Sequence, residues 1–263
     1  MSGAVRPGAS YLNVPIEFIP SVRSTNDEAL RRGAEGAPEG LTIATDEQTG
    51  GRGRHGRVWW DRPGDSLLFS VLLRPRLPVT RLPLLGIAMA CAVAEAGGDV
   101  AGVPLTVKWP NDVLHAGRKL CGILAEARSQ ALSSRAGPSA DGGHALVIGT
   151  GVNVNQRTDD FPAEIRDRAT SLRVAAGREL DRGALLTEIL VHFEAYRALA
   201  AKEGADALKA ALLPRLPATG SRVAVQMAER SVVGTVEEIL ENGALVVRDD
   251  HGTRLAIAAG EIP

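Results

Sequence analysis

The sequence predicts an α/β or α+β domain followed by a small β-barrel. Apolar, strand-like runs and helical patterns follow one another over residues 14–213, which favours a mixed architecture of strands and helices. After residue 213 the pattern changes to short apolar runs separated by the turn pairs Asn242-Gly243 and His251-Gly252, which is typical of a small β domain. The length of 263 residues suits one large domain and one small one.

The first 155 residues contain six strand-like runs and two helical ones. Residues 1–13 are small and polar, so we expect a loose tail there. Ser24 or Thr25 can act as the N-cap of a helix that Gly33 ends, and the apolar segment 81–96 predicts a buried helix. Apolar runs predict β-strands over residues 14–22, 40–48, 65–75, 104–112, 118–128 and 144–155, of which the third is apolar enough for burial on both faces.

The remaining chain predicts a loop, a long helix and the barrel. Residues 129–143 are polar and rich in Gly and Ser, so we expect a hairpin loop between the last two strands of the main domain. Residues 181–213 have helical periodicity with one apolar stripe, and 214–220 read as a linker. The predicted organisation is a flexible tail at 1–13, a main domain at 14–213 and a β-barrel of about four short strands at 220–263.

Charge and cysteine content argue against several classes of protein. Thirty Lys and Arg residues against 31 Asp and Glu residues leave a net charge of −1, whereas a protein that coats nucleic acid usually has a basic excess. The two cysteines do not make a disulfide framework. No signal peptide and no run of ~20 apolar residues is recognisable. We therefore expect a cytoplasmic protein that binds neither membrane nor nucleic acid.

The segment TGGRGRHGRVWW, residues 49–60, concentrates positive charge on a flexible backbone. Its four glycines let backbone N–H groups approach an anion. Arg52, Arg54 and Arg57 present planar guanidinium groups that pair well with phosphate or carboxylate. These residues alone leave three interpretations open: a nucleic-acid contact, a lid over a smaller anion, or a solvated basic loop.

Two neighbouring segments place polar groups where strands end. LTVKWPND (105–112) leaves Asn111 and Asp112 at a strand exit, where α/β-type sheets usually bind ligands. RKLCGILAEA (118–127) begins soon after Asp112, so a hairpin would bring Lys119 near that carboxylate. A lysine there can stabilise a carboxylate that attacks a phosphate. A surface Pro-Asn-Asp turn and a solvated lysine are the structural alternatives.

The strand VIGTGVNVNQ, residues 147–156, has an unusual glycine pattern. Gly149 and Gly151 leave a bare strip against which a flat ligand could lie, and Asn153 on the same strand offers donors and acceptors. A β-bulge is the structural alternative for the glycines.

Two other patterns do not support a function. GDSLLFS (64–70) with DGGH (141–144) superficially matches a GDSL hydrolase, but in that family the serine block lies near the N-terminus and the Asp/His pair near the C-terminus. The five histidines and two cysteines have no metal-ligand spacing, so we expect no protein-held metal.

Taken together and in this order, these segments resemble the biotin–protein ligase family. The resemblance covers the chain from about residue 17 to its end, and GRGRxGRxW combined with KWPND is specific. The residues that carry it are Ser24-Thr25-Asn26, GRGRHGRVW (51–59), KWPNDV (108–113), RKLCGIL (118–124), GTGVNVN (149–155), ATSLR (169–173) and the closing GTVEEILENGALVV. It implies an α+β fold, in which a mixed β-sheet catalytic domain flanked by helices, of the biotin/lipoate ligase type, precedes an SH3-like barrel.

The resemblance implies an ATP-dependent, AMP-forming ligase that uses biotin, ATP and Mg²⁺. Biotin would be activated to biotinyl-5′-AMP and transferred to one lysine of a biotin carboxyl carrier protein or domain of a biotin-dependent carboxylase. Only about 23 residues precede Ser24, too few for a winged-helix DNA-binding domain, so we expect the monofunctional type, a monomer or weak homodimer.

The resemblance also assigns roles to individual residues. The expected biotin-binding residues are Ser24, Thr25, Asn26, Gln48, Arg52, Gly53, Arg54, Lys119 and Gly122. The expected ATP- or adenylate-binding residues are Arg52, Arg54, Arg57, Trp59, Asn111, Lys119 and Asn153. Lys119, Arg54 and Asp112 are the expected catalytic residues, with Lys119 on both the carboxylate and the α-phosphate and Asp112 as orienter or base for the attacking lysine. No role is predicted for Trp60.

Two rival functions are disfavoured by the same residues. Lipoate ligases share the catalytic fold, but their Arg-Arg-x-x-Gly-Gly-Gly motif followed by a His is absent. A nucleic-acid-binding module would need basic charge and stacking aromatics elsewhere, and the chain is neutral and poor in aromatics.

Overall fold

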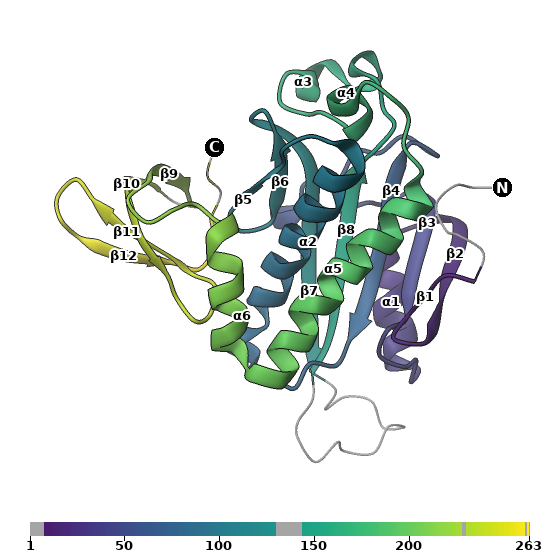
Figure 1. Ribbon diagram of the computed structural model, residues 1–263, viewed down its shortest axis with the longest axis horizontal. Coiled ribbons are helices and arrows are strands. Elements are labelled where there is room, and N and C mark those ends of the chain that lie inside the picture. The colour runs from purple at the N-terminus through teal and green to yellow at the C-terminus, as the bar shows by residue number, and fades with distance from the viewer. Residues whose placement is uncertain (1–7, 130–143, 228–229, 261, 263) are drawn as a thin grey trace.

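The computed structural model describes residues 8–129, 144–227, 230–260 and 262. An eight-stranded sheet runs through the main domain, and a four-stranded sheet forms the C-terminal unit (Figure 1). Strands β2 and β3 are parallel, whereas the other neighbours are antiparallel, so the large sheet is mixed as predicted. Its strands, in spatial order, are β1 (Ser10–Tyr11), β2 (Val14–Val22), β3 (Thr42–Gln48), β4 (Ser66–Leu73), β8 (His144–Asn153), β7 (Arg118–Ser129), β6 (Asp112–His115) and β5 (Thr106–Lys108).

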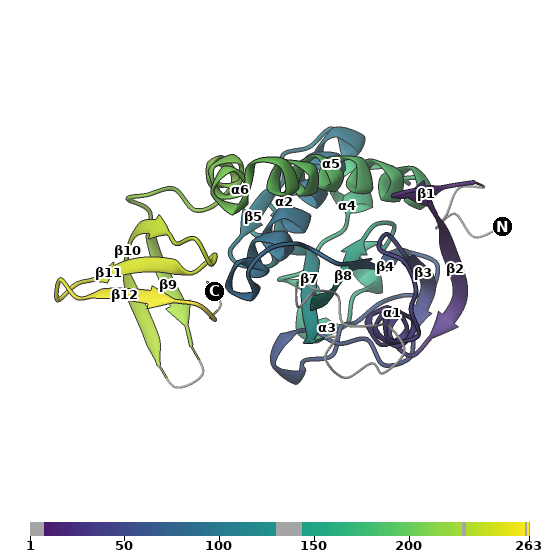
Figure 2. The same ribbon diagram turned by 90° about the horizontal axis from the view of Figure 1, so that it is seen from below.

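Helices cover the two faces of this sheet unequally. Helices α2 (Pro83–Ala101) and α5 (Arg182–Glu203) lie on one face, and α1 (Thr25–Ala34) lies on the other (Figure 2). All eight residues of β4 are buried because helices cover both of its faces. Of the described helical segments, Val79–Ala101 is long and apolar enough to span a membrane, but 72% of its window is buried, so it is a core helix of this fold.

Several elements differ from the sequence-based expectation. Part of the expected tail forms β1, and Tyr11 is buried because its ring packs near Phe193. The long helix predicted over 181–213 is broken at Gly204, whose φ of 88° is not helical. Most of the predicted hairpin loop, residues 130–143, lies outside the described residues. The main domain also contains the shorter helices α3 (Ala163–Arg166), α4 (Leu172–Ala176) and α6 (Ala205–Leu212). Its short 3₁₀ turns are Arg54–Gly56, Val79–Arg81, Thr158–Asp160 and Leu213–Arg215.

The C-terminal unit is an antiparallel meander compatible with an SH3-like barrel. Its strands are β9 (Arg222–Gln226), β10 (Ser231–Ile239), β11 (Leu245–Asp249) and β12 (Arg254–Ile257), in the spatial order β12-β11-β10-β9. Both predicted turns are confirmed, because Gly243 (φ 79°) joins β10 to β11 and Gly252 (φ 82°) joins β11 to β12.

One turn of the barrel is attached to the main domain. The indole Nε1 of Trp109 donates a hydrogen bond of 2.8 Å to the backbone oxygen of Gly243. Trp109 itself is 1% exposed, within the KWPND segment between β5 and β6. This contact attaches the β10–β11 turn of the barrel to the segment between β5 and β6 that also carries Asn111.

Candidate functional site

A pocket lies on the α1 face of the large sheet. Its volume of about 120 Å³ is close to the ~150 Å³ cavity that accommodates one benzene ring. It therefore has room for a ring-sized group. The pocket is lined by Ser24, Thr25, Asn26, Gln48, Arg52, Gly53, Arg54, Arg57, Val58, Trp59, Asn111, Lys119, Gly122, Ile123, Leu124, Gly149, Thr150 and Gly151.

Strand alternation explains why the sheet is hollow here. On β8, Ile148 and Val152 point into the core shared with α2, so Gly149 and Gly151 fall on the opposite face. On β7, Gly122 faces the same way and pairs with Gly151 across the two strands. A Cβ on Gly151 would lie 2.6 Å from the Trp59 indole, and one on Gly122 would lie 2.9 Å from it. Both glycines of the predicted strip lack a side chain on this face, and protein side chains lie against them: the Trp59 ring over Gly151 and Asn26 over Gly149.

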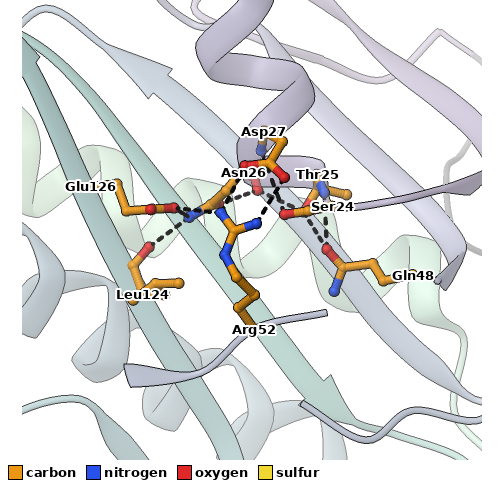
Figure 3. Close-up of polar contacts among 9 residues, drawn as sticks. Ser24, Thr25, Asn26, Asp27, Gln48, Arg52, Leu124 and Glu126 are labelled. Atoms are coloured by element: carbon orange, nitrogen blue, oxygen red, sulfur yellow. Dashed lines mark hydrogen bonds and ion pairs between the residues drawn. The ribbon is translucent and has the colours of Figure 1, made fainter. Parts of the chain in front are cut away.

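The polar end of the pocket is built around the first turn of α1. Ser24 is the N-cap, with its hydroxyl 3.4 Å from the backbone nitrogen of Asp27. Gln48, at the end of β3, accepts hydrogen bonds from the backbone nitrogen and the hydroxyl of Thr25 at 2.9 and 3.1 Å. The N-cap therefore places two adjacent site residues, Thr25 and Asn26, at the sheet (Figure 3).

Asn26 is held in one orientation. Its Nδ2 donates to the backbone oxygen of Leu124 at 3.2 Å and to Glu126 at 2.6 Å, and its Oδ1 lies 2.6 Å from the hydroxyl of Ser70. The side chain lies across Gly149, where a Cβ would be 2.1 Å from Oδ1. Because the residue is only 4% exposed, it has little room to change its rotamer.

The glycine–arginine segment forms a small hairpin over the pocket, which we call the flap (residues 51–59). A bridge joins Arg52 to Val58 at its base, and the tip turns through His55 and Gly56, whose φ angles are 56° and 72°. Positive φ at both positions makes glycine favourable there. The flap is therefore a hairpin with a left-handed turn at its tip.

Arg54 connects the flap to the far wall of the pocket. Its Nη1 donates to Oδ1 of Asn111 at 2.9 Å and to the backbone oxygen of Gly260, beyond the last barrel strand, at 3.2 Å. Asn111 is fixed by Ile123, because its Nδ2 donates to that residue's oxygen and its own backbone oxygen accepts from that residue's nitrogen. The guanidinium thus joins the flap, the β5–β6 turn and the barrel.

Lys119 and Asp112 meet as the hairpin predicts. Nζ of Lys119 lies 2.7 Å from Oδ1 of Asp112 and 5.8 Å from the centre of the Trp59 ring. The Asp112 side chain is 10% exposed and that of Lys119 40% exposed. A cation thus lines the pocket, paired with a nearly buried carboxylate, and it can interact with a bound anion.

Asn153 and Trp60 lie outside the residues that line the pocket. Asn153 is buried and donates to the backbone oxygen of Thr170 at 3.0 Å; Thr170 in turn donates to the backbone oxygen of Lys119. It therefore supports the segment that pairs with the Lys119 backbone. The Trp60 ring packs at 5.4 Å from that of Phe161, which anchors the chain where it leaves the flap.

Charged groups around the flap have perturbed pKa values. Hydrogen bonding to Arg52 lowers the pKa of Asp27, and the same bonds raise that of Arg52. Burial, with a smaller contribution from the charge of Glu47, raises the pKa of Asp61 to about 6. Burial also raises the pKa of the Cys121 thiol beneath the Lys119–Asp112 pair, which makes that thiol unreactive.

Some residues of the site were not predicted from the sequence. Ser70, Asp27 and Glu126 hold the polar end and the flap, and Leu124 lines the wall. A signal existed on β7, because Leu124 and Glu126 follow Gly122 at steps of two and so share its face. Among the described residues, no group of three His, Cys, Asp or Glu side chains could hold a metal ion.

Comparisons with known proteins agree with this geometry. The model of the biotin/lipoate A/B protein ligase family matches residues 18–136. The biotin–[acetyl-CoA-carboxylase] ligase of Mycobacterium tuberculosis is 32% identical over 253 residues, which cover 94% of this chain and 88% of that protein. The enzyme of that name from Paracoccus denitrificans is 32% identical over 91% of this chain and 96% of its own length.

Two further comparisons concern length and structure. The bifunctional ligase/repressor BirA of Bacillus subtilis is 40% identical over 65% of this chain, and the match spans only 50% of that protein. The chain thus matches about half the length of such relatives. The structure of the Aquifex aeolicus biotin protein ligase in complex with biotin and ATP superposes with a TM-score of 0.76 and 29% identity, over 94% of this chain and 97% of that one. Conserved architecture over nearly the whole chain, together with these sequence matches, places the protein in the biotin–protein ligase family.

Proposed function

We propose that this protein activates biotin with ATP to biotinyl-5′-AMP and transfers the biotin to a lysine of a biotin carboxyl carrier domain. The observation that carries the proposal is the convergence, in one pocket, of the polar α1 turn, the flap arginines and Lys119. The Aquifex aeolicus relative, solved in complex with biotin and ATP, supports the same substrates. The buried free cysteines suit the reducing cytoplasm.

The polar end of the pocket would bind the ureido ring of biotin. A ureido group offers two N–H donors and one carbonyl oxygen, and Ser24, Thr25, Asn26 and Gln48 supply both acceptors and donors. The aliphatic chain would run past Leu124 towards Lys119. This places the carboxylate of biotin beside the central cation.

In the first step the carboxylate oxygen attacks the α-phosphorus of ATP and pyrophosphate leaves. The reactants repel each other because both are anionic, and Lys119 would lower that repulsion and stabilise the charge of the transition state. Arg54 and Arg57 would contact the phosphates from the flap, and Trp59 and Asn111 would adjoin the adenine. Mg²⁺ binds mainly through substrate phosphates, so it would arrive on ATP and contribute charge neutralisation.

In the second step the ε-amine of the acceptor lysine attacks the acyl carbon of the adenylate. An amide forms, AMP leaves, and the attacking nitrogen loses a proton. Asp112, whose carboxylate lies 2.7 Å from Lys119, would orient the amine or accept that proton. The flap would keep water from the mixed anhydride until the acceptor arrives.

The proposal is tested by ATP–pyrophosphate exchange measured with biotin, with lipoate and with neither. We expect exchange with biotin but not with lipoate, because the dithiolane ring of lipoate lacks the N–H and C=O groups that the polar end would recognise. Sites built on such hydrogen bonds reject an analogue without them by about 10⁴-fold or more. Exchange that is equal with lipoate, or independent of both acids, would refute the proposal.

Removal of the Arg54 side chain is expected to make the adenylate escape. Arg54→Ala deletes the hydrogen bonds to Asn111 and Gly260 that close the flap. Hydrogen bonds from a charged group predict about tenfold faster release. The measurement is the rate at which preformed adenylate leaves the enzyme, with Arg178→Ala, a surface arginine bonded to Val100, as control. Equal release rates in the two variants would show that the flap does not act as a lid.

A further inference from the structure

The first arginine of the flap lines the pocket, but its guanidinium is already paired with carboxylates. Both terminal nitrogens of Arg52 donate to the carboxylate of Asp27, each at 2.7 Å, and Nη2 also lies 3.6 Å from Oε2 of Glu126 (Figure 3). The guanidinium is therefore saturated on one edge by a bidentate pair and flanked by a second carboxylate. Its positive charge is neutralised before any phosphate arrives.

The two carboxylates come from different elements beside the pocket. Asp27 is in the first turn of α1, directly after Asn26, and Glu126 is on β7. Oε2 of Glu126 also accepts the 2.6 Å hydrogen bond from Asn26. The same carboxylate thus contacts the base of the flap and the residue that shapes the polar end.

The position of Arg52 in the flap gives this contact a mechanical consequence. Arg52 forms the bridge with Val58 that closes the base of the hairpin. Arg54 lies beyond that bridge, on the part of the flap that reaches across the pocket. The pair with Asp27 therefore holds the base of the hairpin, while Arg54 holds its far part to Asn111 and Gly260.

We propose that Asp27 and Glu126 are positioning residues that anchor the flap through Arg52, so that Arg52 is a structural pivot and Arg54 and Arg57 are the arginines that contact phosphate. The inference rests on the proposed function only in naming the ligand that the flap retains. It revises the role expected for Arg52 from the resemblance, in which this side chain wraps phosphate. It also links the two ends of the site, because Glu126 is shared by Arg52 and Asn26.

The experiment is a double-mutant cycle with Asp27→Asn, Arg52→Leu and the double variant. Glu35→Gln is the matched control, because it removes one negative charge from an exposed ion pair near the end of the same helix. The first readout is the rate of trypsin cleavage after Arg54 and Arg57 in the enzyme without ligand. The second is the rate at which preformed adenylate is released.

We expect Asp27→Asn and Arg52→Leu each to raise both rates about fivefold, the scale of one partly exposed, bidentate pair. The double variant should be no worse than either single one, because both changes remove the same interaction. Asp27→Glu should restore slow cleavage, and the thermal unfolding midpoint should match that of Glu35→Gln. Glu126→Gln should raise cleavage less and raise the KM for biotin, because it also loosens Asn26.

Several results would refute the proposal that Asp27 and Glu126 anchor the flap through Arg52. Cleavage rates unchanged by Asp27→Asn would do so, as would additive effects in the double variant. A large loss of adenylation in Arg52→Leu with none in Asp27→Asn would show that Arg52 acts on phosphate. Cleavage is measured without ligand, so it tests the anchor even if the wild-type enzyme makes no biotin adenylate, an outcome that would refute the proposed function alone.

Discussion

Replacing Lys119 by alanine is expected to lower the rate of biotin adenylation by about 10²-fold or more, the usual cost of removing a group that stabilises developing charge. Lys119 is a cation that lines the pocket, 2.7 Å from Asp112. Without it, the two anionic reactants would meet beside a carboxylate. The measurement is single-turnover formation of adenylate at saturating biotin and ATP, so that weakened binding is separated from slowed chemistry.

A second variant separates the stabilisation of charge by Lys119 from a merely structural role of this side chain. Lys119→Ala alone leaves the nearly buried Asp112 carboxylate unpaired, which could destabilise the site by itself. In Lys119→Ala/Asp112→Asn that uncompensated charge is gone. Adenylation should stay low in the double variant. Recovery to a near-normal rate would show that Lys119 only neutralises Asp112.

Replacing Gly149 by alanine is expected to raise the KM for biotin at least about tenfold with little change in the KM for ATP. The added Cβ would lie 2.1 Å from Oδ1 of Asn26, a side chain held by Ser70 and Glu126. Overpacking of this kind costs about 1–3 kcal/mol and moves the neighbour. Steady-state kinetics with each substrate varied in turn measures the effect.

Two comparisons make the Gly149 result specific. Gly86→Ala places a methyl group on α2, 3.5 Å from Ala125, which is ordinary contact distance, so it should leave both KM values unchanged. Asn26→Ser in the Gly149→Ala background removes the clashing amide and should restore thermal stability without restoring biotin affinity. An unchanged KM for biotin in Gly149→Ala would mean that Asn26 is not part of the biotin site.

Much of the site follows from local pattern. These local features are the N-cap at Ser24, the glycines of β8 and the ion pair between Lys119 and Asp112. Each depends on contacts within one element or one hairpin. Such short-range geometry is set by propensity, side-chain alternation and turn chemistry. The mixed sheet and the four-stranded C-terminal unit followed from the order of these patterns and the family resemblance.

Other features depend on contacts between distant segments. Trp60 has no local reason for its position and is explained by Phe161, about a hundred residues further along the chain. Tyr11, which was expected in a loose tail, packs near Phe193 and donates a hydrogen bond to Glu194. The residues around Trp60 and Tyr11 show no periodicity that could indicate these partners. The positions of both side chains depend on contacts with distant segments, which form only in the folded protein.

For this protein, the sequence alone determined the family, the class of fold and most of the residues around the pocket, because these are written in motifs and in the period of the apolar residues. The tertiary structure decided what each arginine of the flap contacts. Arg52 binds Asp27, and Arg54 reaches Asn111 and the barrel. A long, flexible cation can pair with any nearby anion or carbonyl, so its partner is fixed only when the walls of the pocket are assembled around it.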